Sequence, residues 1–173
     1  MNKAALDGYW DHFRTINGIT MRAIAAVPKD KIDTRPCTDM RTPKELISHM
    51  YNSMQMIADG AVKGEIKLTE EADAAAVAKL KTHEDITRFA DESWKAANQA
   101  VQSLSDAQIS GMVKTPWGQS FPGFVCVNII YDEHLHHRGQ LYAYLRQLGV
   151  APPMIWDFDN NAPEFRQKQS QQA

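Results

Sequence analysis

Apolar residues recur every three to four positions along four long segments, and this spacing predicts four amphipathic helices. The first is expected over residues 2–26. The second opens at Thr42-Pro43-Lys44-Glu45, which combines a capping threonine, a proline in the first turn and a capping glutamate. The third is expected over residues 84–104, and the fourth over residues 125–148, ending before Gly149. Because such helices must bury their apolar faces against one another, the pattern predicts an all-α four-helix bundle.

The segments between the long helices carry weaker signals. An alanine-rich stretch at residues 72–80 predicts a short additional helix, and residues 112–121 favour a small hairpin that turns near Trp117 and Gly118. Residues 1–165 are expected to form a single domain. Beyond Pro152 the chain is expected to be extended, with the polar stretch 166–173 as a disordered tail.

Composition narrows the class of protein. A chain of 173 residues can bury a sufficient core without a disulfide or a structural metal, which leaves any bound metal free for function. The 19 basic and 21 acidic side chains give a formal charge of −2, which argues against binding to nucleic acid or to an anionic membrane. The chain has two cysteines, Cys37 and Cys126, a number that suits a reducing compartment, so we expect a cytoplasmic protein.

Histidine is concentrated in the fourth predicted helix, which holds three of the six histidines. With Glu133 at 0° on a helical wheel, His137 lies at about 40° and His134 at about 100°, beside an apolar stripe centred near about 60°. His136 lies at about 300° and points away from this stripe. Two histidines therefore interrupt an apolar face, which is unfavourable unless they have polar partners.

A divalent metal ion is one such partner. Glu133 and His137, four residues apart, can reach one point in space, and so can His134 and His137, three residues apart. A catalytic site also needs a ligand from another element and an open position, and His49, beside the apolar stripe of the second helix, is the candidate. The residues alone leave open whether these histidines hold an ion or are hydrogen-bonded core side chains.

Two motifs resemble a known family. The run Asp132-Glu133-His134-Leu135-His136-His137-Arg138-Gly139-Gln140, with Gly149-Val150-Ala151-Pro152-Pro153 after it, resembles the last helix of DinB-like proteins. This four-helix family of metal-dependent enzymes includes bacillithiol and mycothiol transferases. The stretch Glu45-Leu46-Ile47-Ser48-His49 resembles the second-helix signature of the same family, and the order of elements matches over nearly the whole chain.

The resemblance implies a site for nickel, zinc or a related divalent ion, held by one histidine of the second helix and two histidines, four residues apart, of the last. His49 matches the first and His137 the last, but the remaining position, 133, holds glutamate in this chain. Three alternatives follow. Glu133 takes the place of that histidine as a ligand, His134 substitutes for it from the neighbouring position, or the affinity for metal is lost. Spacing favours Glu133 and burial favours His134; we predict Glu133.

The resemblance further implies an enzyme whose metal activates a water or a thiol, for hydrolase or thiol-transferase chemistry on a small molecule, with a low-molecular-weight thiol as a partner. The alternative is a non-catalytic bundle that binds a metal or a small molecule. A ferritin-like di-iron protein is disfavoured, because it needs Glu-x-x-His pairs on two helices and only Glu133 and His136 have this spacing. A homodimer is a further expectation, with Trp10, Trp94 and Trp156 available for its interface.

Overall fold

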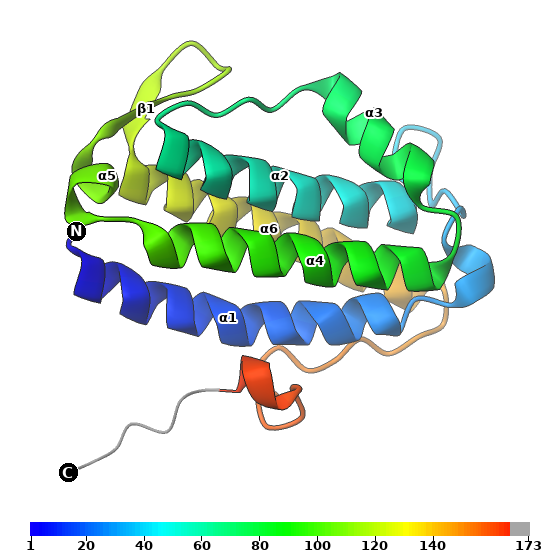
Figure 1. Cartoon of the computed structure of the whole chain (residues 1–173). Helices are drawn as coiled ribbons and strands as arrows, with labels where there is room; N and C mark the ends of the chain where they lie inside the picture. Colours follow the sequence, from blue (N-terminus) through cyan, green and yellow to red (C-terminus); the bar gives the residue numbers. More distant parts are fainter. Residues whose placement is uncertain (167–173) are drawn as a thin grey trace.

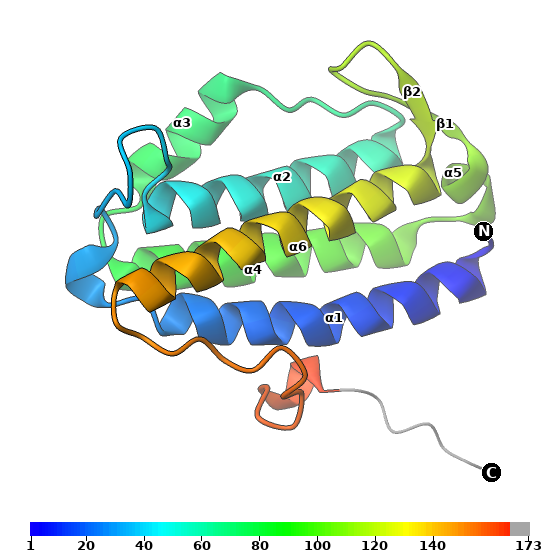
Figure 2. The same cartoon turned by 180° about the vertical axis from the view of Figure 1, so that it is seen from behind.

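The computed structural model describes residues 1–166 and confirms the predicted helical bundle. The four long helices are α1 (Lys3–Ala25), α2 (Pro43–Lys63), α4 (His83–Ser103) and α6 (Gly123–Gln147). Helix α2 packs against α4 and α6, and α1 packs against the same two helices from the other side (Figures 1 and 2). Apart from Arg166, the predicted disordered tail at residues 166–173 lies outside the described residues.

The start of α2 is set by the local sequence. The hydroxyl of Thr42 accepts a hydrogen bond from the backbone N–H of Glu45, and the carboxylate of Glu45 accepts one from the backbone N–H of Thr42. These two bonds satisfy N–H groups that a helix leaves without partners in its first turn. The predicted capping arrangement is therefore confirmed, and it places the following turn of α2, which carries His49, at a defined position.

Shorter elements connect the bundle helices. The alanine-rich segment forms α3 (Glu70–Lys79), as expected, and it lies along the outer side of α2 (Figure 1). The predicted hairpin is present as β1 (Met112–Lys114) and β2 (Ser120–Pro122), an antiparallel pair in which Val113 lies opposite Phe121. The sequence did not predict α5 (Asp106–Ser110), a single turn of helix before the hairpin, or the 3-10 turns η1 (Lys29–Lys31) and η2 (Pro163–Phe165).

The interior of the bundle is built on aromatic side chains. Trp10 and Phe13 of α1 and Trp94 of α4 are buried, and the ring of Trp10 lies 4.8 Å from that of Phe13 and 5.6 Å from that of Trp94. Trp10 and Trp94 therefore belong to the core, and of the tryptophans considered for a dimer interface, Trp156 is the exposed one. Across residues 1–166, no helix combines the length and the apolar character needed to cross a membrane.

The segment after α6 packs along α1. The predicted extended chain is irregular as far as η2, but it is held in place by Asn161, which is buried and donates a hydrogen bond to the backbone carbonyl of Thr15. Arg22 of α1 forms an ion pair with Asp157, with 2.6 Å between the charged atoms. Phe165 is buried against α1 and α4. The C-terminal part of the domain is thus tied to the first helix through side chains far apart in the sequence.

Gly18 permits this close approach. A Cβ atom at Gly18 would lie 2.5 Å from Cβ of Phe165 and 2.6 Å from Nδ2 of Asn161, whereas a Cβ atom at Gly8 of the same helix would meet nothing within 4 Å. We therefore expect Gly18→Ala to lower the free energy of unfolding by about 1–3 kcal/mol. Gly8→Ala should raise it by up to about 1 kcal/mol, since alanine favours the helix more than glycine. Urea unfolding measures both changes, and a gain of stability for both variants would contradict the close contact.

Candidate metal centre

Three polar side chains meet between α2 and α6. His49 projects from α2, and Glu133 and His137 project from one face of α6, so that one potential ligand atom from each lies within 4.8 Å of the others. The imidazole rings of His49 and His137 are 5.0 Å apart and nearly perpendicular. The fold therefore brings together the three residues that the sequence predicts as metal ligands.

His137 is held with one nitrogen free. Its Nδ1 donates a hydrogen bond of 2.9 Å to Oε1 of Gln140, one turn further along α6. Its Nε2 is buried and makes no hydrogen bond, although Oε2 of Glu133 lies 3.2 Å away. Burial lowers the pKa of His137, and the neighbouring His49 lowers it further, against the opposing effect of the bond to Gln140. The neutral imidazole that a metal requires is thus the favoured form.

His49 is held in the same manner by a residue of α3. Its Nδ1 donates a hydrogen bond of 2.5 Å to Oδ2 of Asp73, and Asn52 donates one to the other oxygen of that carboxylate. Burial acts to raise the pKa of Asp73, but the hydrogen bonds from His49 and Asn52 outweigh it and lower the pKa. Because Nδ1 is engaged, Nε2 is the nitrogen of His49 left for an ion. Carboxylates orient metal-binding histidines in this way in many proteins.

The donor set fits a divalent transition metal. Two imidazole nitrogens and one carboxylate oxygen suit zinc, nickel or a related ion. With bonds of about 2.1 Å, tetrahedral ligand atoms lie about 3.4 Å apart, so small side-chain rotations are enough to close the cluster on an ion. The side chain of Glu133 is 48% exposed and that of His137 only 6%. The cluster is therefore exposed to solvent on the side of Glu133 and buried on the side of His137.

His134, the alternative third ligand, faces α1. Its Nε2 lies 2.8 Å from the hydroxyl of Thr20, and its ring lies between those of Phe13 and Tyr51, at 4.9 and 5.8 Å. Complete burial, with smaller effects from the charges of Arg138 and His137, lowers the pKa of His134 to about 3. The structure does not bring His134 to the cluster, and it provides this buried histidine with a partner of another kind.

The remaining histidines lie outside the cluster. His136 and His12 are exposed, as the helical wheel indicates for His136. His83 is half-buried, and its ring forms a hydrogen bond of 3.0 Å with the backbone carbonyl of Ile24. Asp73 was not among the residues predicted from the sequence. No spacing rule relates Asp73 to His49, since the two lie on separate helices.

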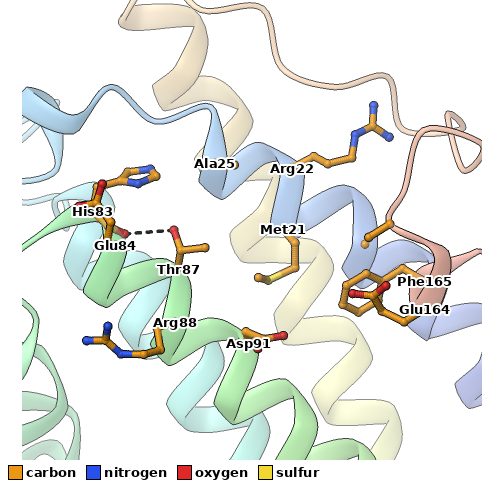
Figure 3. A pocket seen from close by; sticks show the side chains of 12 residues that line it. Met21, Arg22, Ala25, His83, Glu84, Thr87, Arg88, Asp91, Glu164 and Phe165 are labelled. Atoms are coloured by element: carbon orange, nitrogen blue, oxygen red, sulfur yellow. Dashed lines mark hydrogen bonds between the residues drawn. The ribbon is translucent and has the colours of Figure 1, made fainter.

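The structure also contains a hollow of about 600 Å³ between α1 and α4 (Figure 3). Its lining includes Met21, Ala25 and Phe165, and it includes no residue of the candidate cluster His49, Glu133 and His137. Several charged side chains at its rim already have ion-pair partners; these pairs are Arg22 with Asp157, Glu84 with Lys29, Arg88 with Asp85 and Asp91 with Lys95. Most charges at the rim of this hollow are thus already paired within the protein.

Known proteins resemble this chain in both sequence and structure. The uncharacterized protein YjoA of Bacillus subtilis is 19% identical over 140 residues, which span 80% of this chain and 87% of YjoA. Its crystal structure, described as a DinB-like protein, superposes with a TM-score of 0.69 over 83% of this chain and 94% of that chain. A DinB-like protein from Bacillus cereus gives a TM-score of 0.71 at 16% identity, covering 87% of this chain and 97% of that one.

A third structural neighbour is an enzyme. A mycothiol-dependent maleylpyruvate isomerase has a TM-score of 0.66 at 17% identity, and the alignment covers 82% of this chain and 63% of that longer chain. At these levels of identity the structural neighbours show a shared fold. The family model of the DinB family matches residues 1–169, nearly the whole sequence. The chain therefore belongs to the DinB family.

Proposed function

We propose that this protein is an enzyme that depends on a divalent metal and acts on a small molecule, by thiol-transfer or hydrolytic chemistry. The observation that carries the proposal is the convergence of His49, Glu133 and His137, with ligand atoms within 4.8 Å of one another. The two imidazoles are oriented from behind by Asp73 and Gln140. Histidines that bind metals are usually oriented by hydrogen bonds of this kind.

Each residue of the cluster has a distinct part in this proposal. His49 and His137 bind the ion through Nε2, and the more exposed Glu133 supplies a carboxylate that offsets part of its charge. When bound, a divalent ion lowers the pKa of a water or thiol that it contacts and polarises a substrate. Asp73 and Gln140 hold the imidazole rings so that the donor nitrogens need not reorient during the reaction.

The thiol in such a reaction would come from a small molecule. Cys126 is buried, and burial raises the pKa of its thiol, which disfavours the reactive thiolate. Cys37 is exposed, in the segment before α2, and is not part of the cluster. The mycothiol-dependent enzyme among the structural neighbours supports a low-molecular-weight thiol as the partner. Hydrolysis, with water in place of the thiol, uses the same residues.

A turnover assay tests the proposal. Protein loaded with zinc or nickel is incubated with a thiol, such as cysteine or a sugar-linked thiol, and a small electrophile, and the products are followed by mass spectrometry. We expect product formation that is lost on treatment with EDTA and in His137→Ala, whose free nitrogen disappears. A stoichiometrically loaded protein that forms no thiol adduct and no hydrolysis product would favour the non-catalytic alternative, a bundle that binds an ion without turnover.

A further inference from the structure

A pocket of about 470 Å³ lies between α2 and α3 and reaches the candidate metal centre at His49. One wall is formed by α3 and is apolar at Ala74, Val77 and Ala78, and the other comes from the first turns of α2 and from Arg41, two residues before this helix. The lining residues are Arg41, Glu45, His49, Glu70, Asp73, Ala74, Val77 and Ala78. None of the residues of α3 is fully buried. A volume of this size suits a small ligand.

Two of the acidic side chains in this pocket are already engaged. Asp73 accepts hydrogen bonds from His49 and Asn52. Glu45 caps α2 and also forms an ion pair of 2.9 Å with Arg35, which is not a lining residue. Both carboxylates are therefore engaged within the protein, Glu45 by the guanidinium of Arg35 and Asp73 by hydrogen bonds from His49 and Asn52.

Arg41 differs from these residues. It is exposed at the pocket, and within residues 1–166 its guanidinium group makes no hydrogen bond and no ion pair. The carboxylate of Glu70 is also exposed at the rim, and it competes with any anion that approaches Arg41. Arginine binds carboxylates through two parallel hydrogen bonds, which lysine cannot do.

From this arrangement we infer that the pocket binds a small carboxylate, with Arg41 holding the carboxylate group and Ala74, Val77 and Ala78 contacting a short apolar chain. This inference rests on the proposed function in assigning the ligand to the substrate of the metal centre, because His49 both lines the pocket and belongs to the candidate metal-binding cluster. Arg41 would then determine substrate specificity and take no part in holding the ion.

Binding of matched probes to metal-free protein tests the inference. Hexanoate, hexanamide and hexylamine share one chain length and differ in the charge of the head group. Titration of each, followed by amide chemical shifts of α3 in NMR spectra, should show binding in the order hexanoate, hexanamide, hexylamine. Arg41→Gln should weaken hexanoate binding at least tenfold, because the paired charge is lost. Glu70→Gln should strengthen it by about twofold, since a competing charge is removed.

Arg88→Gln is the matched control, because it removes the same charge from an exposed arginine of α4, and neither Arg88 nor its ion-pair partner Asp85 lines the pocket. Its affinity for hexanoate should stay within twofold of that of the parent. Equal hexanoate binding by Arg41→Gln and the parent, or equal binding of hexanoate and hexylamine, would overturn the inference. Because these titrations need no metal, a protein that binds hexanoate through Arg41 but takes up no ion would contradict the proposed function while leaving the carboxylate pocket intact.

Discussion

Replacing His49 or His137 by alanine is expected to reduce bound divalent metal from near one ion per chain to the background level. Each change removes one of two imidazole nitrogens that converge with Glu133, and affinity should fall by more than about 100-fold, since loss of a supporting residue alone costs about 10-fold to 100-fold. Elemental analysis after dialysis against zinc or nickel, followed by titration calorimetry, measures the change. His12→Ala, at an exposed histidine of α1, is the control and should keep its metal.

The same measurement decides the third ligand. Glu133→Gln removes the carboxylate charge and should weaken metal binding strongly, whereas His134→Gln should leave it nearly unchanged, because His134 faces Thr20. Asp73→Asn should lower the affinity by about 10-fold to 100-fold, since it weakens the bond that orients His49. Unchanged metal content in both His49→Ala and His137→Ala would contradict the site, and a strong loss in His134→Gln with none in Glu133→Gln would reverse the assignment.

Acid is expected to destabilise the fold through His134. In the unfolded chain this imidazole takes up a proton near pH 6.5, but in the folded protein only near pH 3, because it is completely buried. Between these values the unfolded state binds more protons, so the free energy of unfolding falls as the pH falls from 6.5 towards 3. The full difference in pKa corresponds to about 5 kcal/mol in the free energy of unfolding, which is a large part of the stability of an ordinary domain.

His134→Leu should remove this contribution. Thr20 keeps a hydrogen bond to the backbone carbonyl of Ile16, so the substitution leaves its hydroxyl with a partner. Urea unfolding in EDTA at several pH values should show similar stabilities for variant and parent at pH 7, and a variant that is more stable by several kcal/mol near pH 4. Parallel stability curves for His134→Leu and the parent would show that His134 does not carry the effect. His12→Leu, at an exposed position, should follow the parent.

Features that depend on neighbouring positions in one helix were predictable from the sequence. The start of α2 follows from Thr42 and Glu45, whose side chains bond to each other's backbone N–H groups within a single turn. The convergence of Glu133 and His137 follows from their separation by four residues, which places both side chains on one face of α6. The buried position of His134 and His137 follows equally from the helical period, because both fall on the apolar stripe.

Contacts between separate elements were not predictable in this way. Nothing in the sequence relates Asp73 to His49, or Asn161 to Thr15, because only packing brings α3 beside α2 and the C-terminal segment beside α1. A glycine such as Gly18 lowers helix propensity, yet in the fold it makes room for Phe165 and Asn161. The free guanidinium of Arg41 and the pocket beside it likewise depend on where α3 lies.

Glu133 and His134 illustrate what the sequence determines and what only the tertiary structure determines. The sequence by itself determined the bundle, the histidine-bearing face of α6 and His49 as the partner residue, since helical period and capping act over a few neighbouring residues. On the wheel, however, His134 and His137 differ by only about 60°, too little to say which neighbour each would meet. The tertiary structure decided this, because α1 presents Thr20 to His134 while α2 presents His49 to His137 and Glu133.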